Sequence, residues 1–487
     1  MTITKNTGFN LLKFAVAFYL AFMTGCSSLP KMVPDMEVQA RPVQVEGARG
    51  PLTVKQSRAI IKQLQERNKG ETNIFDRHLA MEEAIVGSPL IVGNKVTLLI
   101  DGPTTYKAMF DAIEKAKDHI NLETYIFDPD EIGKRFADAL IAKQQSGVQV
   151  NIIYDSVGAL NTPAEFFQRM RDSGIKVLEY NPVNPLKLRK GWDVNQRDHR
   201  KLMVIDGHTA FVGGINISGV YSSSSRSGSS LSSGGGSGSS SKGSGADKED
   251  KDKKGIEGIP WRDTHIRIEG PVVSEFQKLF ITTWENQKGE PLGSREYLPK
   301  QQNKGEQVVR AIGSTPLEPY SQMYVTLLSA INSAETSIFI TNAYFVPDPQ
   351  LKEALQDAAA RGVDVKLILP GKTDSNLVWY ASRSHYTDLL DGGVHIYERQ
   401  DAMLHAKTAV IDGVWSTIGS TNLDWRSFLH NQELDAVVLG HDFGAQMMDM
   451  FAMDLQGSKE ITLEQWKRRS LLDRMKEMGA RIWARWL

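Results

Sequence analysis

The stretch RDHRKLMVIDGHTAFVGGINIS, residues 197–218, decides how this chain folds. It places His199, Lys201 and Asp206 in a run whose other residues predict a buried β-hairpin. The stretch MLHAKTAVIDGVWSTIGSTNLDWRS, residues 403–427, repeats the pattern with His405, Lys407 and Asp412. Because the same polar residues interrupt two similar apolar runs, the repeat indicates a shared chemical function.

The duplication extends beyond these motifs. The segment INLETYIFDPDEIGKRFADALIAKQQSGVQVNIIYD, residues 120–155, aligns with SIFITNAYFVPDPQLKEALQDAAARGVDVKLILP, residues 337–370. Each predicts a strand, a turn at Pro-Asp, an amphipathic helix and a second strand. The matched positions are Tyr125 with Tyr344, Gly147 with Gly362, Gly174 with Gly393, and His199 with His405. So long a repeat predicts a duplicated α/β domain in which helices cover a buried sheet.

Composition bounds the class of protein. The chain has 487 residues, of which 41% are hydrophobic and 24% charged, so it is long enough for two domains. The formal net charge is -1. A nucleic-acid partner is not expected from this balance, since it would have to be met by a local basic groove.

The N-terminus predicts export. Residues 1–25 combine lysines with about ten apolar residues, too few to span a bilayer as a helix, and therefore predict a signal peptide. Met23 to Cys26 resembles a bacterial lipobox, and Cys26 is the only cysteine. The expectation is a lipid-anchored protein in the bacterial cell envelope, outside the cytoplasm. Ser27 favours the outer membrane, facing the periplasm.

The remaining segments suggest the domain limits. Residues 26–53 are expected to form a tether, 54–300 an N-terminal domain and 301–487 a C-terminal domain. Residues 222–255 are rich in Ser, Gly and charge, which predicts a disordered insertion. Near the C-terminus, Trp466, Trp483 and Trp486 alternate with basic residues, which fits a helix either in a membrane interface or packed on its own domain.

The motifs indicate an anion site. Residues i and i+2 of a strand share a face, so each histidine is expected beside its lysine. A lysine beside each histidine would repel a metal ion, and we expect neither a metal nor a cofactor. The pattern instead suits a phosphodiester: the lysines offset charge, one imidazole attacks phosphorus, and the other protonates the leaving oxygen.

The motifs HRKLMVIDG and HAKTAVIDG, followed by GGINIS and GSTNLDWRS, resemble the paired HxKxxxxD signatures of the phospholipase D superfamily. Their surroundings most resemble bacterial cardiolipin synthases, over roughly residues 95–460. The resemblance implies two α/β/α sandwich domains related by a pseudo-two-fold axis, with the active site between them. It also implies a metal-independent reaction through a phosphohistidine.

The resemblance assigns roles to residues of this chain. His199 would be the nucleophile and His405 the general acid and base. The phosphoryl oxygens would be bound by Lys201, Lys407, Asn216 and Asn422, with Gly214 and Ser420 in turns that allow close backbone approach. Asp206 and Asp412 complete the catalytic motifs, but their offset of seven residues predicts that they hold the motif loop. Asp263 and Glu433 are the expected supporting acids, and which acid serves which histidine is left open.

The function expected is phosphatidyl transfer from phosphatidylglycerol, or a similar phospholipid, to a lipid alcohol, which yields cardiolipin. One alternative is a phospholipase D or nuclease that hydrolyses phosphodiesters. Another is a non-catalytic lipoprotein that binds anionic lipid. Water, glycerol, phosphatidylglycerol and phosphatidylethanolamine all remain open as acceptors.

Overall fold

The computed structural model describes residues 43–67, 72–184, 193, 195–223 and 258–483. All of these lie in one compact unit, Glu37–Leu487. The predicted signal peptide, the predicted lipidation site at Cys26 and the part of the predicted insertion beyond Ser223 lie outside the described residues. Trp486 lies outside them as well.

Strands of the first half form a sheet of mixed direction. Its order is β6 (Lys176–Tyr180), β5 (Gln149–Asp155), β4 (His119–Thr124), β8 (Lys201–Ile205), β9 (Thr209–Gly213), β11 (His265–Glu269) and β3 (Leu90–Leu99). The pairs β4–β5 and β5–β6 are parallel, and the others are antiparallel.

The second half repeats this order. It runs β15 (His395–Arg399), β14 (Asp364–Pro370), β13 (Ser337–Asn342), β17 (Lys407–Ile411), β18 (Trp415–Gly419), β19 (Asn431–Leu439) and β12 (Gln307–Ser314), with β20 (Ser458–Ile461) beyond β15. Antiparallel pairing of β3 with β12 joins the halves into one continuous sheet. The repeated order confirms the expected duplication and pseudo-two-fold relation, although the two halves share a sheet.

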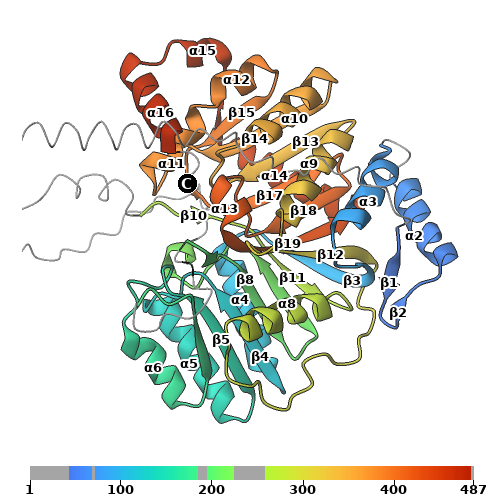
Figure 1. Ribbon diagram of the computed structural model, residues 1–487, viewed down its shortest axis with the longest axis vertical. Helices are drawn as coiled ribbons and strands as arrows, with labels where there is room; N and C mark the ends of the chain where they lie inside the picture. The colour runs from blue at the N-terminus through green and yellow to red at the C-terminus, as the bar shows by residue number, and fades with distance from the viewer. Residues whose placement is uncertain (1–42, 68–71, 185–192, 194, 224–257, 484–487) are drawn as a thin grey trace, which may run out of the picture. The chain divides into compact units, whose positions relative to one another are not determined.

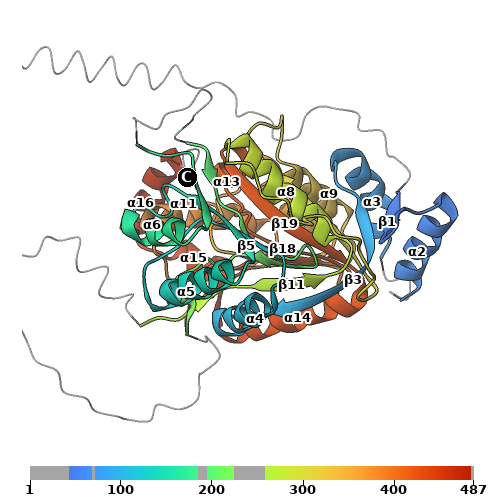
Figure 2. The same ribbon diagram turned by 90° about the horizontal axis from the view of Figure 1, so that it is seen from below.

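Helices cover both faces of this sheet. Figure 2 shows α8 (Val273–Asn286) and α9 (Gln322–Ser333) on one face, and α4 (Gly102–Lys115) and α14 (His441–Gln456) on the other. The crossover helices are α5 (Glu131–Gln145) and α6 (Ala164–Asp172) in the first half, and α10 (Pro349–Ala360), α11 (Asn376–Arg383) and α12 (Tyr386–Asp391) in the second. Because both faces are covered, every residue of β8 and β17 is buried.

Each motif strand ends in a tight turn. The His208 amide donates to the Ile205 carbonyl, and Asp206 and Gly207 between them have φ values of 51° and 62°. Asp412 and Gly413 repeat this conformation, with φ values of 51° and 63°. Two successive positive φ values define a type I′ turn, which joins β8 to β9 and β17 to β18 as the predicted hairpins.

The N-terminal limits differ from the sequence expectation. Residues assigned to the tether form β1 (Val45–Gly47) and β2 (Gly50–Pro51), and β1 pairs parallel with β3 because Val45 fills a fully buried position. Helix α2 (Val54–Arg67) follows, as its periodicity predicts. The folded body therefore begins before residue 54.

Helix α3 (Ile74–Ile85) belongs spatially to the second half, although its residues fall in the predicted first domain. It packs against α9, as Figure 1 shows, and its His78 ring meets Trp415 at 5.6 Å between centroids. The buried Glu82 lies 3.3 Å from Arg310. The ion pair and the ring contact both tie α3 to strands of the second half, which corrects the simple division at residue 300.

In the described part of the chain, no helix is both long enough and apolar enough to span a bilayer.

Candidate active site

Two short parallel strand pairs connect the halves next to the motif histidines. Strand β7 (Arg197–Asp198), just before His199, pairs with the start of β19 in the second half. Strand β16 (Met403–Leu404), just before His405, pairs with β10 (Trp261–Arg262) of the first half. Each histidine thus stands between one of these short strands and its own motif strand, rather than inside a regular strand as the sequence pattern suggested.

This pairing brings each histidine to the acid of the opposite half. The His199 amide donates to the Gln432 carbonyl at 3.0 Å, and the His405 amide donates to the Arg262 carbonyl at 2.8 Å. The next residue after each carbonyl is a supporting acid, Glu433 or Asp263. The ladder register therefore decides which acid serves which histidine.

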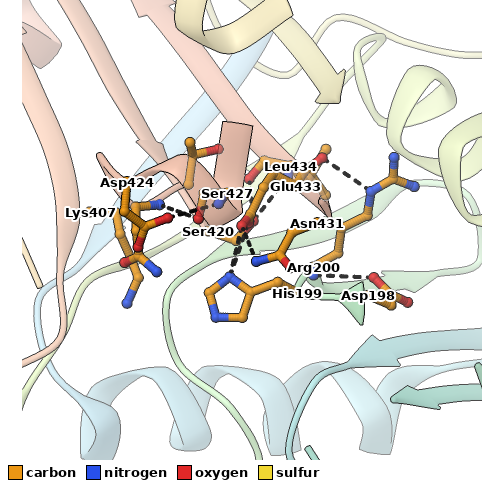
Figure 3. Close-up of polar contacts among 12 residues, drawn as sticks. Asp198, His199, Arg200, Lys407, Ser420, Asp424, Ser427, Asn431, Glu433 and Leu434 are labelled. Atoms are coloured by element: carbon orange, nitrogen blue, oxygen red, sulfur yellow. Dashed lines mark hydrogen bonds and ion pairs between the residues drawn. The ribbon is translucent and has the colours of Figure 1, made fainter. Parts of the chain in front are cut away.

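Glu433 holds His199 through its ring nitrogen Nδ1. The Nδ1 atom lies 3.0 Å from Oε1 and 3.1 Å from Oε2 of the fully buried carboxylate. The same carboxylate accepts hydrogen bonds from Ser420 Oγ at 2.5 Å and Asn431 Nδ2 at 3.2 Å, and Figure 3 shows these groups converging on it. The carboxylate is an acceptor, so Nδ1 carries the proton and the Nε2 lone pair is left for chemistry.

Asp263 holds His405 in the same way. Its Oδ2 lies 2.7 Å from His405 Nδ1, and its Oδ1 accepts the Thr264 amide at 2.7 Å. Two further groups approach Nδ1, namely Lys407 Nζ at 2.9 Å and the Tyr221 hydroxyl at 3.2 Å. The carboxylate can only accept, so the Nδ1 proton points to Asp263. No described residue hydrogen-bonds Nε2 of His199 or His405.

The motif lysines lie beside their histidines, as the i, i+2 spacing predicts. Lys201 Nζ donates to the His199 carbonyl at 2.5 Å, and Lys407 Nζ donates to the His405 carbonyl. Both lysines are nearly fully buried. In the described part of the chain, no grouping of three or more His, Cys, Asp or Glu side chains is arranged to hold a metal ion.

Burial and mutual repulsion perturb these bases. Burial lowers the pKa of Lys201 to about 7 and that of Lys407 to about 8, and the charge of Lys407 adds to the effect on Lys201. Burial also lowers the pKa of His199 to about 4, opposed by Glu433 and reinforced by Lys201. The pKa of His405 is lowered by burial and by Lys407. A bound anion would therefore favour the protonated forms of all four groups.

The supporting acids stay ionised. Burial alone would raise the pKa of Glu433, but His199, Lys201 and the Ser420 hydroxyl hold it below its usual value. Burial would likewise raise the pKa of Asp263, and His405 and Lys407 hold it down. Each pair is thus a neutral imidazole donating to a carboxylate, the form in which Nε2 is nucleophilic.

The motif aspartates lie at the far ends of the motif strands from the lysines. Asp206 accepts backbone N–H groups of Lys117, Asp118 and His119 at 2.8 to 3.0 Å. Asp412 accepts those of residues 335–337 and also the Thr72 hydroxyl at 2.5 Å. These carboxylates tie the motif hairpin to the start of the neighbouring strand and do not face the histidines.

Gly214 and Ser420 occupy equivalent turns but act differently. A Cβ atom on Gly214 would lie 2.2 Å from Asp263 Oδ1, so only glycine leaves room for that carboxylate. At the matching position Ser420 donates its hydroxyl to Glu433. Both turn positions thus help to place a supporting acid. The sequence pattern indicated only that these turns allow close approach of the backbone to a substrate.

The two motif asparagines are buried beside the site. Asn216 Oδ1 accepts the Ile126 amide at 3.1 Å, and its Nδ2 donates to the Tyr221 hydroxyl at 3.2 Å. Asn422 donates its backbone amide to Ser427 Oγ, and its buried Oδ1 has no hydrogen-bond partner among the described residues. Asn216 therefore positions Tyr221, whereas the Asn422 Oδ1 atom is still able to accept a hydrogen bond.

Aromatic residues that sequence analysis did not single out surround His405. The rings of Tyr221 and Trp261 lie 5.8 and 5.3 Å from His405, and 5.3 Å from each other. They flank the undescribed segment 224–257, so both ends of the insertion return to the active site. Their only sequence signal is this flanking position.

A tyrosine also stands against each histidine. Tyr125 meets His199 edge to face at 5.2 Å, and Tyr344 meets His405 at 6.3 Å. Phe127 and Phe345 form equivalent isolated bridges, to Ile217 and Leu423, so Phe127 corresponds to Phe345 across the repeat. Tyr125 therefore corresponds to Ala343, and the expected match of Tyr125 with Tyr344 is wrong by one residue.

The comparisons with known proteins agree with this geometry. A family model described as "Cardiolipin synthase, PLD-like domain" matches residues 109–225 and 327–455. A cardiolipin synthase of Geobacillus sp. (strain WCH70) is 34% identical over 406 residues, which cover 83% of this chain and 74% of that protein. The major cardiolipin synthase of Bacillus subtilis (strain 168) is 33% identical over 397 residues, covering 80% and 74%.

A solved structure shares the fold. The phosphatidylserine synthase of Haemophilus influenzae Rd KW20 superimposes with a TM-score of 0.57 at 14% identity, covering 83% of this chain and 96% of that one. At this identity the likeness concerns the fold alone. The family model covers both motif regions, and the relatives match along most of their length. This chain belongs to the cardiolipin synthase family of phospholipase D-like enzymes.

Proposed function

We propose that this enzyme transfers a phosphatidyl group from phosphatidylglycerol, or a similar phospholipid, to a lipid alcohol through a phosphohistidine. One observation carries the proposal: each motif histidine is held at Nδ1 by a buried acid from the opposite half, with a lysine beside it. Two such units, whose Nε2 atoms have no hydrogen bond to a described residue, would supply both a nucleophile and a proton carrier. Similarity to cardiolipin synthases supports phosphatidyl transfer as the reaction.

In the first step, Nε2 of His199 attacks the phosphorus of the donor lipid. A phosphorus–nitrogen bond forms as the phosphorus–oxygen bond to the departing alcohol breaks, and His405 gives that oxygen a proton. In the second step, neutral His405 takes the proton of the acceptor hydroxyl, whose oxygen attacks phosphorus and releases His199. Protons and atoms balance over the cycle, and no redox step is needed.

Lys201 and Lys407 supply the charge for both steps. Burial lowers their pKa values to about 7 and about 8, and these values rise when a phosphodiester brings its negative charge between the lysines. Fully protonated lysines then stabilise the additional charge of the pentavalent transition state. The same anion raises the pKa of His405, which prepares it to act as the acid.

Radiolabelled phosphatidylglycerol followed by rapid denaturation tests the mechanism. Label is expected on the wild-type chain and, for longer, on His405→Ala, whose intermediate breaks down slowly. His199→Ala should carry none, with turnover lower by at least about 10⁴-fold. Label on His199→Ala but not on His405→Ala would reverse the two roles, and label on neither histidine variant nor the wild type would refute the covalent path.

The product of the same reaction tests the acceptor. A transferase yields cardiolipin and glycerol, whereas a phospholipase D yields phosphatidate. The motif geometry suits both reactions, and the family favours transfer. Phosphatidate as the sole product in every lipid mixture would replace the proposal by a hydrolase. Binding of anionic lipid without any turnover would identify a non-catalytic protein.

We also propose a lipid anchor on Cys26 that holds the enzyme to a membrane outside the cytoplasm, with the outer membrane favoured by Ser27. Support comes from the apolar segment that ends in Met23-Thr24-Gly25-Cys26 and from the absence of any other cysteine in the sequence. Cys26→Ser should abolish incorporation of labelled palmitate and leave an unprocessed precursor. Continued incorporation in that variant would contradict the anchor.

A further inference from the structure

Helix α16 (Leu471–Trp483) presents apolar side chains to solvent. Six of the thirteen large hydrophobic residues exposed in the described chain lie on this helix, with exposed fractions from 49% to 76%. They are Leu471, Leu472, Met475, Met478, Ile482 and Trp483, and we call them the α16 surface. Single exposed apolar residues are ordinary, but six on one helix form a continuous patch of the kind that marks an interaction site.

An ordinary surface helix turns its apolar side towards the protein, whereas α16 turns this side towards solvent. At 100° per residue, the six apolar side chains and Gly479 fall on one side, while Glu477 and Ala480 fall on the other. Glu477 and Ala480 are the buried residues, and α16 packs through this side against α11 (Figure 1). Arg469 fixes the orientation through its 2.9 Å bond to Glu477. The apolar stripe thus faces away from the protein.

Basic residues border the stripe. Arg474 and Arg481 lie along one edge and Lys476 along the other. Residues 463–483 contain six basic and three acidic residues, so this end of the chain carries a local excess of three positive charges in a chain of net charge -1. Arg474 and Lys476 donate hydrogen bonds to neutral groups, the Lys467 carbonyl and the Tyr380 hydroxyl. These bonds do not neutralise the two positive charges, which can therefore attract phosphates.

The surface adjoins the His405 side of the active site. Lys476 Nζ bonds to Tyr380 on α11 at 3.1 Å. The loop just before α11 carries Asp374, whose two carboxylate oxygens each lie 2.8 Å from the Tyr344 hydroxyl. The Tyr344 ring in turn faces His405. Helix α11 and the Asp374–Tyr344 pair therefore lie between the apolar stripe and His405.

We propose that the α16 surface docks into the interface of an anionic lipid bilayer and holds the active-site mouth against it. Apolar and tryptophan side chains on one face with arginine and lysine at its borders match the chemistry of an interfacial helix, in which the stripe enters the acyl boundary and the bases reach lipid phosphates. The choice of a bilayer over a protein partner rests on the proposed function, since both substrates would be lipids.

An environment-sensitive fluorophore tests the docking directly. The full chain with Cys26→Ser accepts a single label at Met478→Cys, and Glu66→Cys on exposed α2 serves as the matched control. On phosphatidylglycerol vesicles, the label at 478 should shift to shorter wavelength and be quenched by lipid-borne quenchers, with at least a threefold smaller response on phosphatidylcholine vesicles. A water-like signal at 478, or an equal response at 66, would overturn the proposal. A shift without vesicles that grows with protein concentration would assign the surface to a second copy of the chain.

Turnover separates docking from catalysis. Met475→Asp with Met478→Asp should lower turnover of phosphatidylglycerol in vesicles at least tenfold and leave turnover of monomeric short-chain phosphatidylglycerol unchanged. Leu160→Asp with Leu317→Asp, exposed positions elsewhere, should change neither. Loss of both activities in the α16 variant would contradict a docking role. If the wild type bound vesicles through α16 but turned over neither lipid, the proposed function would fail while the docking inference stood.

Discussion

The Nδ1 atom of His199 lies 3.0 Å from Oε1 of Glu433, a residue 234 positions away in the other half of the chain. The reciprocal pair, His405 with Asp263, spans 142 positions in the opposite direction. Neither half therefore contains a complete histidine and acid pair of its own. The candidate active site is therefore complete only when both halves are folded and joined.

The crossed pairs predict which step each acid controls. Glu433→Gln should slow formation of the phosphohistidine by about 10- to 100-fold, because Nδ1 of His199 loses the carboxylate that supports its positive form. Asp263→Asn should slow breakdown of the intermediate by a similar factor. Quenched-flow measurement of labelled enzyme separates the two rates. Glu460→Gln, an exposed acid on β20, is the control. A normal rate of phosphohistidine breakdown in Asp263→Asn, or a normal rate of its formation in Glu433→Gln, would contradict the pairing.

The close contact between Gly214 and Asp263 predicts that a substitution at Gly214 displaces this acid without changing any charge. Gly214→Ala places a Cβ where Asp263 Oδ1 stands, so the carboxylate must move away from His405. Activity should fall by about 10- to 100-fold. Gly87→Ala, whose Cβ would meet no atom within 4 Å, should keep full activity. Normal turnover in Gly214→Ala would show that the Asp263 position tolerates displacement.

The lowered lysine pKa values predict how stability depends on pH. Between pH 7 and 10.5, the folded chain binds fewer protons at Lys201 and Lys407 than the unfolded chain, so the free energy of unfolding should rise with pH across this window. Lys201→Met should remove part of the slope and raise stability at pH 7 by roughly 1 to 3 kcal/mol while abolishing activity. Denaturant unfolding at several pH values measures this.

Phosphate provides the complementary measurement. Inorganic phosphate should raise Tm and be taken up together with protons near pH 7 to 8, because it restores the charge of both lysines. Calorimetry in buffers of different ionisation enthalpy reports the proton count. Binding with no proton uptake would contradict the lowered lysine pKa values.

Activity should survive chelation. A lysine lies beside each histidine and is expected to face the phosphoryl group, so the charge of that group would be met without a metal ion. Turnover is expected to stay within twofold after incubation with EDTA. A loss of turnover that zinc or magnesium restored would contradict this mechanism.

The insertion should be dispensable for folding. The rings of Tyr221 and Trp261 lie 5.3 Å apart, so a short linker from Ser222 to Gly258 can join the two ends without moving them. The deletion should change stability by no more than about 1 kcal/mol, since loop closure depends only weakly on length. Any effect should appear in the ratio of transfer to hydrolysis, because both ends meet His405. A deletion that unfolds the chain would refute this.

Local sequence patterns were enough for much of this molecule. Alternation and helical spacing predict the repeated strands and helices, and the apolar runs around the motifs predict the hairpins, because these patterns depend on neighbouring residues alone. The HxKxxxxD spacing likewise places each lysine beside its histidine. The grouping of two imidazoles and two lysines was therefore predictable from the sequence, and their part in the reaction stays a prediction.

Tertiary structure alone decided how these parts combine. Glu433 reaches His199 because β7 pairs with β19, a two-residue ladder too short to leave a pattern in the sequence. The placement of α3 on the second half follows from its buried Glu82 meeting Arg310 across more than two hundred residues. The amphipathic character of α16 is visible in the sequence, but the direction of its apolar face depends on which side packs against α11. Such long-range contacts are set by the joint packing of distant segments, which no local pattern encodes.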